Sequence, residues 1–165
     1  MTDETTVTPR VTCAVMSAAL QASARRLLGG FLAADQHYRA SAEAYGDGGT
    51  DALDRALDLF LARPELGFVW LAEAGGTAVG ACVVSFAIST SRGGLAAKLD
   101  DVTIDPQWRG KGVGGAMLTA LARYLRARGV GRIDSGCHRG NDGAWRFYAR
   151  QGFRSLDEER IALLL

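Results

Sequence analysis

The sequence lacks the features of membrane-spanning, secreted and disulfide-stapled proteins. It contains no apolar run long enough to span a bilayer, and the run Ala78 to Ile88 is only strand-sized. Its first residues, Met1 to Glu4, are acidic and lack the apolar core of a signal peptide. Its three cysteines, Cys13, Cys82 and Cys137, are odd in number and far apart, which favours reduced core residues. These absences predict a cytoplasmic protein with no membrane partner.

An excess of charge of either sign is also missing. The net charge of +1 argues against nucleic acid as a principal partner. The charges are uneven, since residues 1–99 hold eight Lys/Arg and ten Asp/Glu, whereas residues 100–165 hold eleven and eight. The second part is therefore the basic one, which favours a polyanionic ligand there. A length of 165 residues, 48% of them hydrophobic and 22% charged, predicts a single globular domain over 1–165 with a frayed tail at 1–8.

A glycine-rich stretch at residues 109–114, Arg-Gly-Lys-Gly-Val-Gly, is the most informative motif that is present. It lies between a predicted strand and a predicted amphipathic helix, so its small residues leave backbone N–H groups uncovered at a helix N-terminus. Such a terminus binds phosphate. Two nucleotide loops with similar glycines do not fit. A Walker A loop needs Lys followed by Ser or Thr, whereas Lys111 is followed by Gly112. The dinucleotide fingerprint belongs to an N-terminal strand–helix unit, whereas this stretch starts at residue 109 of 165.

Hydrophobic periodicity and turn residues predict alternating strands and helices. The predicted strands are Val11–Val15, Phe68–Glu73, Ala78–Ile88, Lys98–Ile104, Val130–Cys137 and Glu159–Leu165. The predicted helices are Ser17–Ala34, Thr50–Ala62, Val113–Arg128 and a short helix that starts at Asp142 or Gly143 and runs to Gln151. Gly29 and Gly30 predict a bend or break in the first helix, because each glycine costs about 1 kcal/mol relative to alanine. Residues 89–97 are predicted to form a loop.

Three motifs resemble those of the GCN5-related N-acetyltransferase (GNAT) family. Arg109, Gly112 and Gly114 match its Arg-x-x-Gly-x-Gly pyrophosphate loop. Val102, Ile104 and Pro106 match the family's fourth strand and the turn after it. The family's second motif is matched by Asn141, Ala144, Phe147, Tyr148, Gly152 and Phe153. The resemblance covers roughly Leu66 to Leu165. It implies an α/β (α+β) fold with a mixed, mostly antiparallel sheet of six to seven strands and helices on both faces.

The resemblance also implies acetyl-CoA as cosubstrate and assigns residues to it. The implied cofactor-binding residues are Val102, Thr103, Ile104, Arg109, Gly110, Lys111, Gly112, Val113, Gly114, Asn141 and Tyr148. Tyr148 is the implied general acid for the departing thiolate, since a phenol with a pKa near 10 suits that role.

The base that takes the proton of the acceptor amine is expected on the strand that carries Asp100 and Asp101. Adjacent strand residues point to opposite faces, so at most one of the two carboxylates faces a given cleft. Asp100 is the first choice as catalytic base, because Val102 and Ile104 are its period-two partners on a defined face. Asp101 remains an alternative and is expected to bind substrate.

The predicted function is acetyl-CoA-dependent N-acetyl transfer to the primary amine of a small molecule. Similarity to the diamine/thialysine branch of the family favours a polyamine or amino-acid-like acceptor, with His37 and Tyr38 in the substrate-binding segment. A protein N-terminal, lysine or antibiotic acetyltransferase and a non-catalytic acyl-CoA sensor are the alternatives. No metal is expected, since His138 has no ligand-spaced partners. The apolar run Leu163–Leu165 favours an edge strand that would pair in a homodimer.

Overall fold

The structure, a computed structural model, describes residues 10–46, 48–156, 158 and 162–164. Its elements in chain order are β1 (Val11–Val15), η1 (Ala18–Leu20), α1 (Gln21–Ala34), α2 (Gln36–Tyr45), α3 (Thr50–Ala62), β2 (Gly67–Ala74), β3 (Thr77–Ser89), β4 (Gly94–Ile104), η2 (Pro106–Trp108), α4 (Val113–Ala127), β5 (Ile133–Ser135) and α5 (Asp142–Arg150). The predicted tail at residues 1–8 lies outside the described residues, as do residues 159–161 and 165 of the predicted last strand.

The described strands form one mixed sheet in the order β1-β2-β3-β4-β5, antiparallel from β1 to β4 and parallel between β4 and β5. The predicted fold class is confirmed, but the prediction of six to seven strands is wrong, since the described residues form five. Ala162–Leu164, the described part of the predicted last strand, are not in a strand. Leu163 and Leu164 are 84% and 58% exposed. An apolar run forms a strand only where a neighbouring strand pairs with it, which composition does not show.

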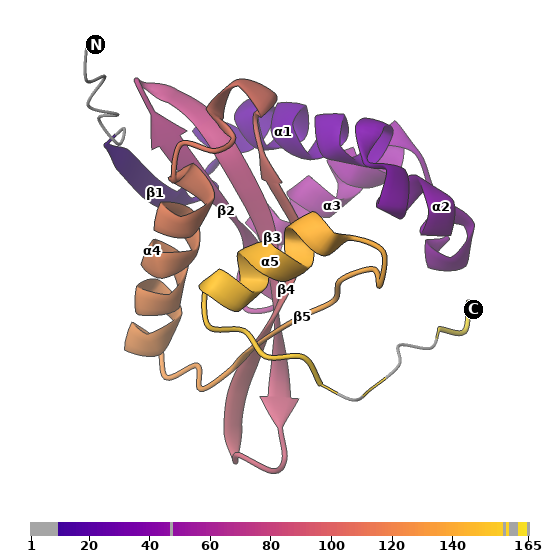
Figure 1. Ribbon diagram of the computed structural model, residues 1–165, viewed down its shortest axis with the longest axis vertical. Helices are drawn as coiled ribbons and strands as arrows, with labels where there is room; N and C mark the ends of the chain where they lie inside the picture. The colour runs from indigo at the N-terminus through magenta and orange to yellow at the C-terminus, as the bar shows by residue number, and fades with distance from the viewer. Residues whose placement is uncertain (1–9, 47, 157, 159–161, 165) are drawn as a thin grey trace, which may run out of the picture.

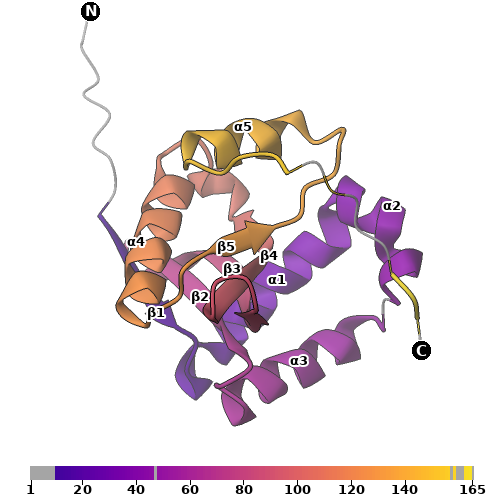
Figure 2. The ribbon, with the colours of Figure 1, turned by 90° about the horizontal axis from the view of Figure 1, so that it is seen from below.

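Helices cover both faces of the sheet, as Figures 1 and 2 show. On one face, Leu28 of α1 and Leu57 of α3 pack in a cluster with Leu71 of β2. On the other face, Met117 of α4 belongs to a cluster that contains Leu99 of β4, and α5 lies beside α4 over the same face. Burial of each such side chain contributes about 1.5–3 kcal/mol to folding. Across the described residues, no helix combines the length and apolar character that crossing a membrane requires.

The first helix differs from its prediction. It starts with the 3-10 turn η1, and α1 then runs unbroken through Gly29 and Gly30. A Cβ at Gly29 would lie 3.6 Å from Leu53 of α3, an ordinary van der Waals distance, so the packing of the two helices does not require a glycine there. The chain turns at Asp35, where the carboxylate accepts a hydrogen bond from the Tyr38 backbone N–H at 2.7 Å and caps α2.

Candidate active site

Strands β4 and β5 pair over a short stretch and then separate, and a cavity lies where they separate. β5 is shorter than predicted, and it pairs with β4 only where residues 133–135 face residues 97–99. β4 begins earlier than predicted, at Gly94 instead of Lys98, and ends at Ile104. On the side of β5, no described strand pairs with the last five residues of β4. α5 lies in front of β4 in Figure 1. A cavity of about 1860 Å³ is lined there by β4, the residues after β5, α5 and the α1–α2 junction.

The cavity brings together residues that are far apart in the sequence. Seven of the predicted site residues line it: His37, Tyr38, Asp100, Asp101, Val102, Asn141 and Tyr148. The glycine loop at 109–114 is not part of this lining and lies at the start of α4. Thr103, also predicted to bind the cofactor, has a buried side chain, so only its backbone can serve a ligand.

A β-bulge interrupts β4 at the cavity wall. Val83 of β3 pairs with Asp100 and Ala81 pairs with Thr103, so β4 holds one extra residue between these two pairs. Asp101 takes up the extra length with a φ of 51°, a left-handed conformation that Asp adopts more readily than most residues. The bulge therefore leaves part of the backbone out of the β3–β4 ladder beside the cavity.

This bulge overturns the face assignment expected from the sequence. Val102 and Ile104 pack with the core cluster that contains Leu99, the α4-side cluster, so they do not share a face with Asp100. Regular alternation would place Asp100 and Asp101 on opposite faces, yet both line the same cavity. Both carboxylates line the cavity, and the bulge interrupts the alternation between them, so strand alternation does not choose one of them.

The two carboxylates differ in their electrostatic surroundings. Asp100 Oδ2 lies 2.8 Å from Lys98 Nζ and forms an ion pair with it. Burial, and secondly the negative charge of Asp100, raise the pKa of Asp101 to about 6, while Lys98 lowers it by a smaller amount. A carboxylate with that pKa is ionised at neutral pH and is a stronger proton acceptor than an ordinary aspartate.

Tyr148 of α5 lines the same cavity. Its ring packs against Phe147 and Phe153, with centroid separations of 5.4 Å and 5.2 Å. Burial raises the pKa of Tyr148 to about 12, and a hydrogen-bonding interaction with the Ser135 side chain opposes part of that rise. The negative charge of Asp100 acts in the same direction as burial. A phenol with that pKa keeps its proton at neutral pH and is therefore able to donate it.

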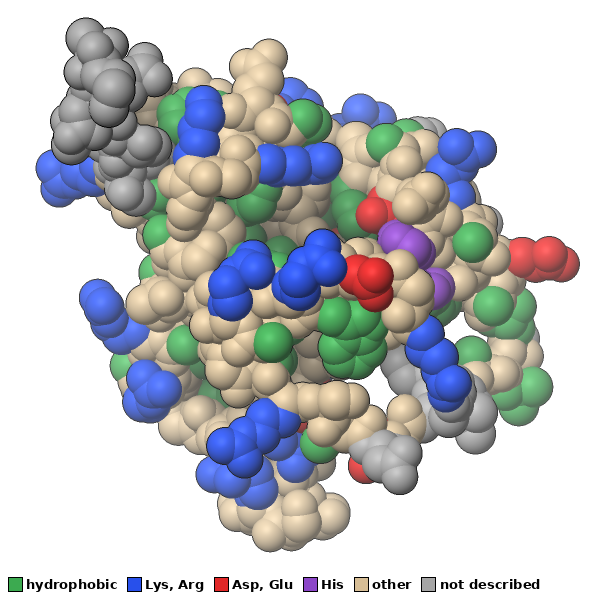
Figure 3. Space-filling model, in the orientation of Figure 1, with side chains coloured by type: hydrophobic (Ala, Val, Ile, Leu, Met, Phe, Trp, Pro, Cys, Tyr) green, Lys and Arg blue, Asp and Glu red, His purple; other side chains and the backbone are tan. Residues whose placement is uncertain are grey.

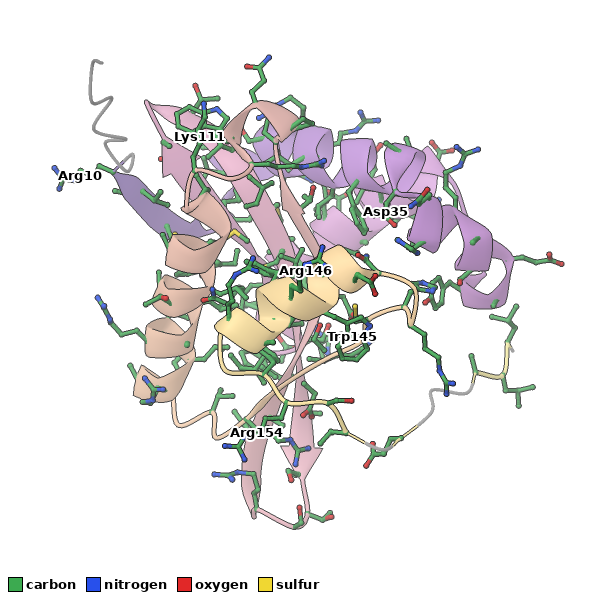
Figure 4. The ribbon with its side chains drawn as sticks, viewed as in Figure 1. Arg10, Asp35, Lys111, Trp145, Arg146 and Arg154 are labelled. Carbon is green, nitrogen blue, oxygen red and sulfur yellow. The ribbon has the colours of Figure 1, made fainter. Side chains whose placement is uncertain are left out.

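The glycine loop connects β4 to α4, and Figure 4 shows Lys111 there. Gly110 and Gly112 have φ values of 73° and 79°, which L side chains rarely adopt. The Ala116 N–H donates to the Gly112 carbonyl at 3.0 Å, so the N–H groups of residues 113–115 precede the first helical hydrogen bond. Lys and Arg side chains gather on the face that carries α4 and α5 (Figure 3). The loop thus offers backbone donors within a basic surface.

Other groups of the loop have structural partners. Arg109 Nε donates to the Ile104 carbonyl at 2.9 Å, which closes the loop onto the end of β4. Lys111 Nζ lies 5.3 Å from the centroid of the Trp108 ring. A Cβ at Gly114 would lie 3.0 Å from the Phe147 ring, so this glycine lets α5 pack against α4. Arg109 and Gly114 therefore shape the loop whether or not they touch a ligand.

An arginine of α1 holds the start of this loop, and the sequence reasoning missed it. Arg26 Nη2 donates to the Ala78 carbonyl at 2.6 Å, and Nη1 lies 3.4 Å from Asp105 Oδ2. Asp105 accepts from the Gln107 N–H at 3.1 Å, and its own N–H donates to the Val79 carbonyl at 2.8 Å. Arg26 thus joins α1, β3 and the loop. Its partners lie 52 and 79 residues away, so no local pattern marks it.

Asn141 caps α5. Its Oδ1 accepts a hydrogen bond from the Ala144 N–H at 3.0 Å. Because that cap uses the side-chain oxygen, the amide nitrogen is the group left to donate to a ligand in the cavity. Ser135, which the sequence reasoning did not single out, donates through Oγ to the Leu99 carbonyl at 3.0 Å. This bond lies at the last β4–β5 pair, where the strands begin to part.

The α1–α2 side of the cavity is aromatic. The rings of His37 and His138 stack with centroids 5.6 Å apart. Tyr38 stacks on Tyr45 at 5.9 Å and tilts against Phe31 at 6.1 Å. All five side chains line the cavity. His138 was considered only as a metal ligand in the sequence, and its place beside His37 follows from the fold.

Among the residues that the structure describes, no three His, Cys, Asp or Glu side chains form a group that would hold a metal ion. The absence of a metal stays a prediction. Cys13, Cys82 and Cys137 are free thiols. Cys82 is buried in the core, whereas Cys137 lines the cavity and is not a core residue.

The chain matches a family model and a curated protein. Residues 33–153 match the model of the Acetyltransferase (GNAT) family. An uncharacterized N-acetyltransferase of Methanocaldococcus jannaschii is 33% identical over 97 residues, which are 58% of this chain and 42% of that protein. The chain thus spans less than half the length of that curated relative.

Solved structures share the fold over nearly the whole chain. An integron cassette protein from the mobile metagenome of Cole Harbour Salt Marsh matches with a TM-score of 0.74 and 25% identity, covering 93% of this chain and 90% of its own. The aminoglycoside N-acetyltransferase AAC(6')-Iy, solved with a CoA bisubstrate analogue, matches with a TM-score of 0.73 and 17% identity, covering 94% and 97%. At that identity the second match shows the fold alone. The family match spans most of the chain, and the chain therefore belongs to the GNAT family of acetyltransferases, enzymes that take their acetyl group from acetyl-CoA.

Proposed function

We propose that the protein acetylates the primary amine of a small molecule, of polyamine or amino-acid-like kind, in the cavity between β4 and β5. One observation carries the proposal: Asp101 and Tyr148 line the same cavity beside an unpaired strand edge. Amide formation from a thioester and an ammonium needs a proton acceptor for the amine and a proton donor for the thiolate. These two side chains supply one of each.

The residues present fit acetyl-CoA. The backbone N–H groups of residues 113–115 would donate to its pyrophosphate, with the Lys111 ammonium nearby. The unpaired edge of β4, from Asp100 to Ile104, would take the pantetheine arm as an added strand. Asn141 would donate to that arm through its amide nitrogen. Acetyl-CoA supplies the acetyl thioester, and the protein supplies position and proton transfer.

The bulge in β4 supports a role in polarising the thioester carbonyl. A bulge leaves one residue out of the ladder, so a backbone N–H near Asp101 has no ladder partner. An N–H fixed in place at that point would stabilise the charge that develops on the carbonyl oxygen.

We propose that Asp101 accepts the proton of the amine, in preference to Asp100, which was the first choice from the sequence. Asp100 is already paired with Lys98, whereas the raised pKa of Asp101 brings its basicity closer to neutral pH. Tyr148 would give its proton to the departing sulfur, as the family resemblance implies. The aromatic side chains around His37 and Tyr38 would bind the remainder of a cationic acceptor, since aromatic faces attract cations.

A thiol-release screen tests the function. The purified protein is mixed with acetyl-CoA and a panel of amines: diamines, polyamines, amino acids, an aminoglycoside and a peptide with a free N-terminus. We expect acetyl-CoA cleavage with a small amine and an acetylated product in the mass spectrum. Turnover only with the aminoglycoside or the peptide would replace the proposed acceptor, and tight binding without any turnover would favour an acyl-CoA sensor. The proposal also keeps the predicted cytoplasmic location, which the three free thiols support.

Asp101→Asn is expected to lower kcat by about 100-fold or more, the range for loss of a general base. In the unmodified enzyme, kcat/KM should fall as the pH drops through about 6, because Asp101 must be ionised to accept a proton. Asp100→Asn should keep most of the activity and move this acid limb to lower pH, since the charge of Asp100 raises the pKa of Asp101. Rate–pH profiles of the three proteins measure both effects. Equal, pH-independent losses in both variants would contradict the assignment.

The thermal stability of Asp101→Asn provides the control. The pKa of Asp101 in the folded protein, about 6, lies above its unfolded value near 3.9, so ionising this carboxyl costs stability. The cost is absent below pH 4 and complete above pH 6. Asparagine adopts the left-handed conformation as aspartate does, so Asp101→Asn should melt no lower than the unmodified protein at pH 8. A lower melting temperature there would mean that lost activity reflects misfolding.

Arg26→Met is expected to raise the Kd for acetyl-CoA by about tenfold, because the loop loses its anchor to α1 and β3. Arg25→Met is the matched control, since Arg25 pairs with Asp54 on the exposed surface, 2.6 Å away. Isothermal titration with acetyl-CoA gives both affinities. Equal affinities in the two variants would show that the anchor does not position the loop.

A further inference from the structure

Lysine is scarce in this chain, and both lysines lie at the cofactor site. The sequence holds seventeen arginines but only Lys98 and Lys111. Lys111 is exposed in the glycine loop, where it lies over Trp108. Lys98 is on β4, two residues before Asp100, and lines the cavity. The chain therefore presents one side-chain amine of its own at the place where an acceptor amine must react.

The position of Lys98 matches that of an acceptor. Its Nζ lies 2.8 Å from Asp100 Oδ2, and its charge lowers the pKa of Asp101. Tyr148 lines the same cavity and responds to the charge of Asp100. The Lys98 side chain lines the cavity and is 46% exposed. The Lys98 ammonium thus lies beside Asp100 and Asp101, the two carboxylates near which a bound amine would lose its proton.

We propose that Lys98 is a self-acetylation site that reacts when acetyl-CoA is bound and no acceptor is present. This inference rests on the proposed function. The Lys98 ammonium gives one proton to Asp100, and its nitrogen forms a bond to the acetyl carbonyl carbon as the bond from that carbon to sulfur breaks. Tyr148 gives its proton to the sulfur and regains one from the nitrogen. The products are acetyl-lysine, the CoA thiol and one proton on Asp100.

The modification changes the electrostatics of the site. Acetylation removes the positive charge of Lys98 and its ion pair with Asp100. Two neighbouring carboxylates then share the cavity without their cation, and the acetylated side chain occupies space beside them. The modified protein is less active toward an external amine, so the reaction limits the use of acetyl-CoA when acceptor is scarce.

The test incubates the full chain with acetyl-CoA alone and follows the mass of the intact protein and of its peptides. We expect one acetyl group on Lys98, at a rate per molecule that does not change with protein concentration. Lys111 is the internal control, because it is the other lysine and is exposed as Lys98 is, so uncatalysed acetylation would label both. Lys98→Arg keeps the charge beside Asp100 and should remove the label, and Tyr148→Phe should slow it by about tenfold or more.

Two results separate this inference from the proposed function. If the protein turns over an amine acceptor but Lys98 stays unmodified, or if Lys98 and Lys111 react at equal rates, the inference is overturned and the function stands. If acetyl-CoA neither binds nor is consumed with any amine, the proposed function fails and the inference fails with it.

Discussion

Gly112→Val is expected to weaken acetyl-CoA binding by on the order of 100-fold, about 2.7 kcal/mol, while the protein still folds. Gly112 has a φ of 79° at the N-cap of α4, and a β-branched residue cannot hold that conformation without strain. The loop would shift, and the N–H groups of residues 113–115 would lose their common direction. The pyrophosphate would then lose several charge-assisted hydrogen bonds together.

The measurement is the rise in melting temperature with acetyl-CoA, which follows RT ln(1 + [L]/Kd) for a ligand that binds only the folded protein. Gly93→Val is the matched control, since Gly93 has a φ of 64° in the β3–β4 turn with open space around it. Both variants carry similar backbone strain, but only Gly112→Val should lose the ligand-induced shift. A full shift in Gly112→Val would disprove the assignment of this loop to the pyrophosphate.

Tyr148→Phe is expected to lower kcat by about 10- to 1000-fold with little change in the Kd for acetyl-CoA. Phenylalanine keeps the ring contacts with Phe147 and Phe153 and removes only the hydroxyl, so packing is preserved. Because the pKa of Tyr148 is about 12, the unmodified enzyme should show no loss of activity from this group up to pH 10.

Tyr124→Phe controls for the removal of a tyrosine hydroxyl elsewhere. Tyr124 packs against Trp70, with ring centroids 4.9 Å apart, in the cluster beneath α4. Steady-state rates of both variants, measured with the best amine of the screen, separate the two roles. If Tyr148→Phe keeps the full rate at every pH, Tyr148 is a packing residue and another group protonates the thiolate.

Much of the fold follows from local sequence signals. The helix that ends at Ala62, before Pro64, matches its predicted end, whereas residues 50 and 51 lie in its first turn and Gly49 is the N-cap. The hairpin of β2 and β3 was expected from the turn at Gly75 and Gly76, both of which have positive φ. The glycine loop lies between β4 and α4 as predicted, because its small residues suit a backbone that no other residue type adopts as readily.

The parts that sequence reasoning missed depend on contacts between distant segments. Nothing in the run of Asp100, Asp101 and Val102 distinguishes a regular strand from a bulged one, because the extra residue is defined only against β3. The choice of Asp100 as base rested on that regular strand. His138 and Arg26 acquire their places only when α1 and α2 fold against the rest of the site. Spacing along the chain predicts the loop and proposes Tyr148 as the acid, but it does not say which carboxylate serves the amine.

A crystal structure of the protein with CoA tests the central claim most directly. We predict that the pantetheine arm lies between β4 and β5 along the unpaired edge from Asp100 to Ile104, with the pyrophosphate on the N–H groups of residues 113–115. The thiol should then lie within hydrogen-bonding distance of the Tyr148 hydroxyl and beside Asp101. A CoA molecule bound elsewhere on the protein, or a thiol pointing away from Tyr148 and Asp101, would contradict the account.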